Sequence, residues 1–333
     1  MKVKHQGFTL IELIITLAII SILASAYAGL SSQIGLFYST ERELTNDNDL
    51  RAIADAHVKY AAIHNKGKLL APFNDSECNS CAVNTSIVEL VNYIEARSQR
   101  PASVVNYDSS SMQNVRGLMI DPTAYQVSFN LPSAINLVLD YSAGVVVQTD
   151  CAKDSQCDEA QSWSSPAYTQ ADWTPSSRIT KAIPFNNLET MQNLAASSVE
   201  RAVYVQQKIR EYTQEMVVSN PANVDSNYFP VSTHPSTPDY SDSNPIDNGG
   251  CINGWFDLSS SDVNVLQIIG LNQSYGLTLF GGSIEYCADY DLLAVDASNA
   301  DTAPHMGALR INRFITQGIS PTSNSNDNII FPL

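Results

Sequence analysis

Basic residues are scarce in this sequence. Its 333 residues include 18 Lys and Arg against 34 Asp and Glu, which gives a formal net charge of −16 at pH 7. A protein that binds a nucleic-acid backbone needs clustered Lys and Arg side chains to neutralise the phosphates. The acidic balance therefore excludes a broad nucleic-acid-binding surface, and we expect no nucleic-acid partner.

Several catalytic and metal-binding patterns are also missing. The sequence has no G-x-S-x-G, H-E-x-x-H or P-loop pattern, and its five His residues lie scattered without a nucleophile at a suggestive distance. The acidic stretches 225–247 and 323–328 lack the ligand spacing of an EF-hand loop. We therefore expect no enzyme, no metal site and no cofactor.

Long apolar segments are absent except for one near the N-terminus. Phe8–Leu30 is 23 residues long, Glu12 is its only charge, and Lys2 and Lys4 precede it. A helix of this length rises about 34 Å, which is enough to cross a bilayer core of about 30 Å. The positive-inside rule then places the N-terminus in the cytoplasm and most of the chain on the other side of the membrane.

The start of this segment carries a specific motif. Residues 7–13 read Gly-Phe-Thr-Leu-Ile-Glu-Leu, which resembles the processing signature of type IV prepilins and type II secretion pseudopilins. The resemblance implies that a prepilin peptidase cuts between Gly7 and Phe8, that the new N-terminal amine of Phe8 is methylated, and that Glu12 pairs with this amine in a neighbouring subunit. Gln6 departs from the pattern, since the family commonly has Lys or Arg there.

The resemblance also implies where the chain resides. The apolar helix would anchor the precursor in the inner membrane as a single span and would then lie among the helices of other pilins, in an extracellular pilus or a periplasmic filament. A buried amine–carboxylate pair favours correct register more than it adds stability. The alternative is an ordinary secretory peptide cut near Ala26 or Ala28, and Glu12 counts against it.

The helical pattern continues beyond the apolar segment. Apolar residues keep helical spacing to His64, and Asn65-Lys66-Gly67 is a plausible stop because Gly67 can adopt a positive φ. One helix over residues 8–65 follows the leader 1–7, and its amphipathic second part is expected to pack under a head. Together with the antiparallel strands expected in this head, the long helix matches the α+β plan of pilins.

Residues 66–150 are predicted to form a pilin-like head with an antiparallel sheet. A short helix is expected at 86–96, and a hairpin turn is expected at 142–144. The predicted strands are 118–120, 125–131, 135–140 and 143–149. Residues 151–186 are polar, contain Ser and Pro, and have no clear period, so we expect a loop or linker there.

The second half, 187–333, begins with another helical pattern. Leu188, Ala195, Ala202, Ile209 and Met216 recur every seven residues, and the pattern ends before Asn220-Pro221. Met191, Val205 and Tyr212 form a neighbouring row with the same spacing, which Ser198 interrupts. A polar loop at 221–250, a short helix at 261–269 and strands near 275–280, 283–288 and 292–295 are expected to follow. This order resembles that of the first head, which predicts a second head-like half; the alternative is one enlarged domain.

Six cysteines in a chain exported to an oxidising compartment favour disulfides. Short separations favour three pairs, with Cys81–Cys151 open as an alternative. A zinc site formed by the first four cysteines of the chain is disfavoured, because the spacing of the second two is wide and the compartment oxidises thiols. The favoured pairs are Cys78–Cys81, Cys151–Cys157 and Cys251–Cys287.

These features together predict a filament subunit. The head is larger than a shaft repeat usually allows, so we expect a minor pilin at the tip or at initiation. The first alternative is a pilus-borne adhesin whose C-terminal half binds a surface ligand. The second is a pseudopilin of a type II secretion system, although the large tip-type pseudopilin typically lacks the glutamate that Glu12 supplies here.

Overall fold

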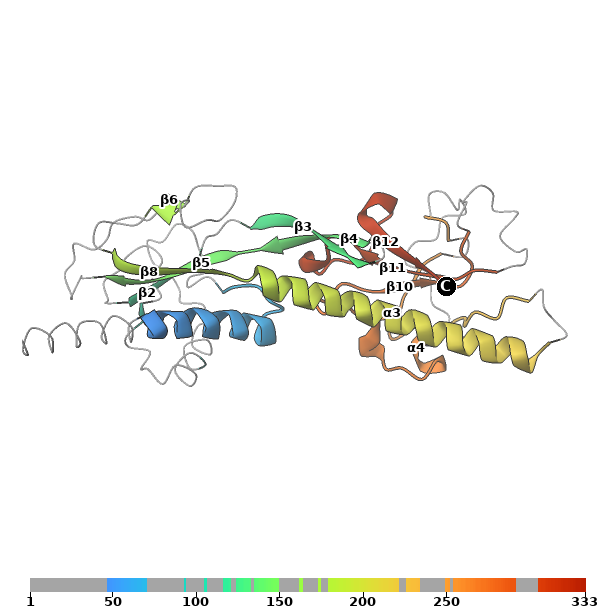
Figure 1. Cartoon of the computed structure of the whole chain (residues 1–333). Helices are drawn as coiled ribbons and strands as arrows, with labels where there is room; N and C mark the ends of the chain where they lie inside the picture. Colours follow the sequence, from blue (N-terminus) through green and yellow to red (C-terminus); the bar gives the residue numbers. More distant parts are fainter. Residues whose placement is uncertain are drawn as a thin grey trace, which may run out of the picture.

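The computed structural model combines helices with mainly antiparallel sheets, which confirms the α+β class (Figure 1). Two four-stranded sheets are each covered by a helix, and a two-stranded hairpin lies between them. The structure describes residues 47–70, 93, 105–106, 116–120, 124–132, 135–149, 162–163, 173–174, 179–221, 226–233, 249–251, 254–291 and 305–333.

The first module is a helix over residues 47–64 packed on a sheet. The buried residues Leu50, Ile53, Ala54 and Ala61 of this helix follow helical spacing and face the sheet. The strand order is β1 (Val105–Asn106), β2 (Arg116–Ile120), β5 (Ala143–Thr149), β8 (Ile179–Asn186), with only β1 and β2 parallel.

The end of this helix agrees with the prediction. Helical structure stops at His64, Gly67 adopts a φ of +82°, and the Gly67 N–H donates to the Ala61 carbonyl over 2.8 Å. The Ala61 carbonyl also accepts from the Asn65 N–H at 3.0 Å, so the left-handed turn at Gly67 adds a second bond to this carbonyl and closes the helix end. The stop signal therefore acts as expected.

His57 is a fully buried residue of the helix over 47–64. Its Nε2 accepts a hydrogen bond from the Leu70 N–H at 3.2 Å, and its ring lies 5.6 Å from that of Phe185. Burial lowers the pKa of His57 to about 3 from 6.5, because the charged imidazolium would lose its hydration. The neutral form is therefore the one that the fold accommodates.

This burial predicts a loss of stability in acid. Below pH 6.5 the unfolded chain takes up a proton at His57 that the folded chain does not, so the free energy of unfolding falls as the pH falls toward 3. We expect a loss of about 2 kcal/mol at pH 5 relative to pH 8. The measurement is the unfolding midpoint of the full chain in detergent. His57→Gln should remove this part of the slope, whereas His64→Gln, at an exposed site of the same helix, should keep it; equal slopes in all three would contradict the assignment.

Strands β3 (Tyr125–Leu131) and β4 (Ile135–Tyr141) form an antiparallel hairpin that confirms two expected strands. The predicted turn at 142–144 is wrong, because β4 pairs with β3 whereas β5 pairs with β2 and β8. Gly144 lies inside β5, where a Cβ atom would come within 2.6 Å of the Phe185 ring. Gly144 is therefore needed for close packing inside a strand, whereas the sequence analysis interpreted it as a turn residue.

The predicted linker 151–186 is wrong at its end, because residues 179–186 form strand β8. Pro184 obscured this strand in the sequence. Among the strands that the structure describes, β8 lies at the edge of its sheet and pairs with β5, so the missing N–H of Pro184 is tolerated there. Within the same segment, the short strands β6 (Ser162–Trp163) and β7 (Trp173–Thr174) pair with each other.

Helix α3 (Leu188–Ser219) has 32 residues and confirms the second predicted helix. Ala195, Ala202 and Ile209 of the seven-residue pattern are completely buried. Ser198, which interrupted the neighbouring row, is also buried. Its hydroxyl donates to the Leu194 carbonyl at 2.8 Å and accepts from the Leu279 N–H at 3.0 Å, so this polar group is satisfied on both sides.

The second module is α3 packed on a four-stranded sheet. The strand order is β12 (Asn328–Pro332), β11 (Ala308–Asn312), β10 (Glu285–Cys287), β9 (Phe256–Asp257). The strand expected near 283–288 is present as β10. The expected strand at 275–280 is wrong: a 3₁₀ helix, η3 (Gln273–Gly276), occupies its first part. The short helix expected at 261–269 is reduced to α4 (Val265–Ile268), and the strand expected at 292–295 lies outside the described residues. The remaining elements are the 3₁₀ helices η5 (Ile315–Gln317) and η6 (Ser325–Asp327).

Asn187 joins the two modules. Its side-chain amide donates to the Gly67 carbonyl at 2.7 Å and accepts from the Ser142 N–H at 2.7 Å, and the residue is completely buried. Lys66 adds a bond from its Nζ to the Phe280 carbonyl at 3.1 Å. The start of α3 is thereby held at the end of helix 47–64, and the two helices follow one another along the long axis of the molecule (Figure 1).

The β3–β4 hairpin packs with the second module. Leu137 and Leu139 of β4 are completely buried in the same core as α3 and the second sheet. The Val138 N–H also donates to the Arg313 carbonyl at 2.9 Å. Residues 125–141, which the sequence assigned to the first head, therefore contribute to the core of the second half.

Candidate functional site

The processing and assembly residues expected from the sequence, Gly7, Phe8 and Glu12, lie outside the described residues, as does the apolar segment 8–30. In the part of the chain that the structure describes, no helix is both long and apolar enough to cross a membrane.

The Cys251–Cys287 disulfide is formed, with Cα atoms 5.9 Å apart, which confirms this one of the expected pairs. Both cysteines are completely buried, in a cluster with Trp255, Tyr290 and Ala308. The bond ties the segment before β9 to the end of β10. The other four candidates, Cys78, Cys81, Cys151 and Cys157, lie outside the described residues.

A buried ion pair lies beside this disulfide. Glu285 of β10 and Arg310 of β11 face each other across the sheet, with Arg310 Nη2 and Nε 2.5 and 2.6 Å from Glu285 Oε2. Their side chains are 2% and 3% exposed, and the guanidinium lies 4.3 Å from the centre of the Trp255 ring. Removal of either partner would destabilise the fold, because the remaining charge would be uncompensated in the core. Its role is structural.

The sequence analysis did not identify this pair. The available signal was one charged residue inside each of two apolar strands, Ile-Glu-Tyr at 284–286 and Leu-Arg-Ile at 309–311. Nearby, His305 Nδ1 lies 3.9 Å from Asp289 Oδ1, which is too long for a hydrogen bond. Within the described ranges, no three His, Cys, Asp or Glu side chains gather closely enough to hold a metal ion.

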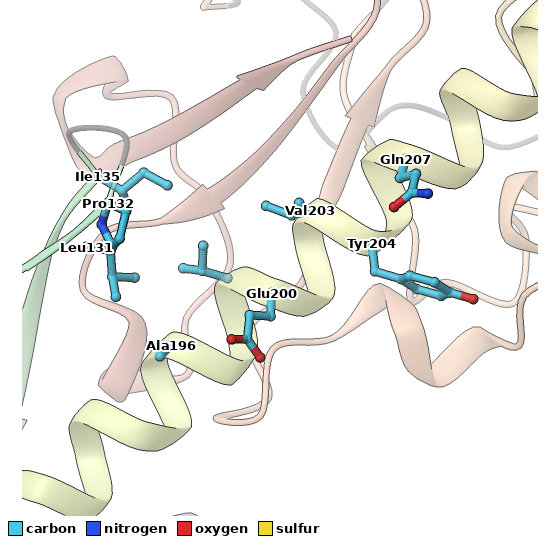
Figure 2. Close-up of a pocket in the computed structure, with 9 residues that line it drawn as sticks. Leu131, Pro132, Ile135, Ala196, Glu200, Val203, Tyr204 and Gln207 are labelled. Carbon is cyan, nitrogen blue, oxygen red and sulfur yellow. The ribbon is translucent and has the colours of Figure 1, made fainter.

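The outer face of α3 carries a hollow of about 390 Å³ that is lined mainly by apolar side chains, here called the apolar hollow. Figure 2 shows the end of the β3–β4 hairpin facing α3 across this space. Val203 and Tyr204 remain 43% and 40% exposed here. The lining residues are Leu131, Pro132, Ile135, Ala196, Val199, Glu200, Val203, Tyr204 and Gln207.

A second hollow, here called the polar hollow, has a volume of about 530 Å³ and lies between α3 and η3. Glu200 and Tyr204 line both hollows, so the two adjoin. The Tyr204 and Tyr275 rings lie 5.7 Å apart. The other lining residues are Ser197, Arg201, Asn272 and Ser274.

The polar hollow is held in shape by its own hydrogen bonds. Arg201 Nη1 donates to the carbonyls of Ser274 and Leu277 at 3.2 and 2.8 Å, and its guanidinium lies 5.8 Å from the centre of the Tyr275 ring. The Asn272 side chain accepts from the Ser274 N–H at 2.9 Å and caps η3. Sequence analysis missed both hollows; the signal was Val203 and Tyr204, two apolar residues outside the buried stripe of α3.

The comparisons with known proteins concern the N-terminus. The family model of the prokaryotic N-terminal methylation motif matches residues 2–28, a range that contains Gly7, Phe8 and Glu12. The match confirms the sequence-based recognition of this segment. The chain has no match among the curated proteins and none among the solved structures.

Proposed function

We propose that this chain, which carries the methylation motif of type IV pilins and prepilins at residues 2–28, is a minor pilin-like subunit at the tip or initiating end of a type IV pilus or related secretion filament. The motif implies processing by a prepilin peptidase, insertion into the membrane and assembly with other pilins. The motif match is the observation that carries the proposal. In the proposal, cleavage falls between Gly7 and Phe8, and Phe8 is methylated.

The linear arrangement of the two modules supports a place at the tip. Asn187 holds the start of α3 at the end of helix 47–64, and the 32 residues of α3 continue from there over about 48 Å. In a filament whose N-terminal helices stack in parallel, the next subunit toward the tip would occupy the space beyond the C-terminal end of helix 47–64. A second module in that space obstructs further stacking above this chain, so a terminal position suits it better than a shaft position.

A specific observation also favours the adhesin alternative. The two adjoining hollows on α3 lie in the second module, which the proposal places farthest from the filament core. A tip subunit that displays this surface could both start a filament and bind a ligand. The pseudopilin alternative shares the processing chemistry, and Glu12 weighs against its large tip-type member.

Processing is tested first. N-terminal sequencing and mass analysis of the mature chain should give a methylated Phe8. Gly7→Leu should leave a heavier, uncut precursor in the membrane, because the peptidase must accommodate a small residue before the cut. A mature chain that begins at Tyr27 or Gly29 would refute the proposal in favour of a secretory signal.

Glu12→Val tests assembly separately from processing. We expect cleavage and membrane insertion to persist, since removal of a carboxylate from an apolar span lowers the cost of insertion. Incorporation into filaments should fall at least about tenfold, because the amine of a neighbouring subunit loses its partner in the dry core. The readout is the amount of the chain in sheared filaments relative to the membrane fraction. Undiminished incorporation would contradict the pairing role of Glu12.

A further inference from the structure

Two exposed apolar features lie on different modules of this chain. Ile63, in the last turn of helix 47–64, is 64% exposed. The apolar hollow on α3 has a volume of about 390 Å³ and is bordered by Val203, which is 43% exposed. A single exposed apolar residue needs no explanation. A protruding apolar side chain and an apolar recess on the same chain, however, can fit each other between two copies.

We infer that the apolar hollow of one copy binds Ile63 of a second copy of this chain. The contact joins different surfaces of the two copies, so it is heterologous. Together with the proposed function, it places more than one copy of the chain at the end of a filament. The contact itself depends on neither processing nor filament assembly.

The spacing of charged and apolar side chains agrees on the two helices. On helix 47–64, Lys59 lies four residues before Ile63. On α3, Glu200 lies three residues before Val203, and both line the apolar hollow (Figure 2). Each helix therefore has a charged residue about one turn before an exposed apolar residue. When the two helices run in the same direction, the apolar side chains meet each other and the ammonium group meets the carboxylate.

The charges near the contact favour it despite the net charge of −16. The Debye length is about 8 Å at physiological ionic strength, so distant exposed charges are largely screened. The exposed charges around the end of helix 47–64 are mainly positive. They are Lys59, Lys66 and Lys68, against Asp55 one turn before Lys59.

Glu200 is the matching carboxylate on α3. No hydrogen bond or ion pair joins it to any residue that the structure describes. The nearby cations are engaged elsewhere, because Arg201 donates to two carbonyls and Lys208 pairs with Glu211 at 2.7 Å. The Glu200 oxygens are therefore open to an ammonium group of a second copy. An exposed ion pair contributes little free energy, so it orients the contact, while burial of the isoleucine stabilises it.

The test measures self-association of the purified full-length chain by sedimentation equilibrium, in a detergent whose micelles outnumber the protein. We expect a Kd of about 10–100 μM, because one apolar anchor and one exposed ion pair make a small interface. Ile63→Asp and Val203→Asp should each weaken association about tenfold or more, since each places a charge against an apolar surface. Val218→Asp, at a 79% exposed valine near the end of α3, is the matched control and should associate as the original chain does.

A mixture of the two variants identifies a heterologous contact. Ile63→Asp retains an intact hollow, and Val203→Asp retains an intact isoleucine. An equimolar mixture should therefore form mixed dimers although neither variant associates alone, which also shows that both variants are folded. A mixture that stays monomeric while the original chain associates would overturn the inference. So would either variant that associates as strongly as the original chain.

The ion pair is tested by an exchange of its charges. Lys59→Glu and Glu200→Lys should each weaken association several-fold, and the double variant should recover it. A double variant that associates no better than the single variants would contradict the pairing and with it the parallel orientation of the helices.

An original chain that stays monomeric at about 500 μM would overturn the inference, because the expected Kd lies below this concentration. The hollow would then be left for a different occupant, such as a peptide or a small molecule. This outcome is independent of the tests on Phe8 and Glu12, so failure of the self-association and failure of the proposed function are distinguishable.

Discussion

Replacing Arg310 with Met should lower the free energy of unfolding by about 3–5 kcal/mol, because Glu285 would then be an uncompensated charge in the core. The pair is 2–3% exposed and lies under the Trp255 ring, so water cannot take over the role of the lost guanidinium. The measurement is chemical unfolding of the full-length chain in detergent, followed by tryptophan fluorescence.

A double variant distinguishes the cost of an unpaired charge from the cost of replacing both side chains. Glu285→Met combined with Arg310→Met should recover most of the loss, since apolar residues of similar volume often replace a buried pair at little cost. Arg51→Met, at an exposed position of helix 47–64, is the control and should change stability by less than about 0.5 kcal/mol. If Arg310→Met behaved like this control, the pair would not be buried as the structure has it.

Removing the Cys251–Cys287 disulfide should cost about 4 kcal/mol, since the bond closes a loop with a sequence separation of 36 and limits the unfolded chain. We expect the double Ser variant to unfold at a distinctly lower denaturant concentration than the original chain. The original chain should resist reductant until it unfolds, because both sulfur atoms are completely buried.

The matched measurement compares four samples, the original chain and the double Ser variant, each unfolded with and without reductant. Reductant should lower the unfolding midpoint of the original chain by at least as much as the double substitution lowers it. An unfolding midpoint shared by the variant and the original chain under oxidising conditions would contradict a stabilising role of the bond.

The packing of the β3–β4 hairpin affects how the halves can be tested. Deletion of residues 187–333 would remove α3 and the second sheet, against which Leu137 and Leu139 are completely buried. It would also remove Asn187, which bonds to Gly67 and Ser142. Such a truncation would expose a hydrophobic strand in what remains, so the role of the second half is better tested by point variants on its surface than by its deletion.

Local patterns predicted the elements that depend on neighbouring residues in the chain. The spacing of Ala195, Ala202 and Ile209 gave α3 almost to its ends, and the stop at Gly67 followed from its backbone freedom. The methylation motif is likewise contiguous, and its recognition is confirmed by the family match at residues 2–28. Periodicity and short motifs contain this information because the interactions that they describe span only a few residues.

Pairing between distant segments could not be predicted in the same way. Strand β8, with Pro184 inside it, forms because β5 accepts it as an edge partner, and β4 leaves β5 for a different sheet. Glu285 meets Arg310, and the hairpin end meets α3 to form the apolar hollow, only after the chain has folded. The amino-acid order predicted the helices and the methylation motif. The folded arrangement created the buried ion pair and the hollows on α3, because these depend on contacts between residues that lie tens to hundreds of positions apart in the chain.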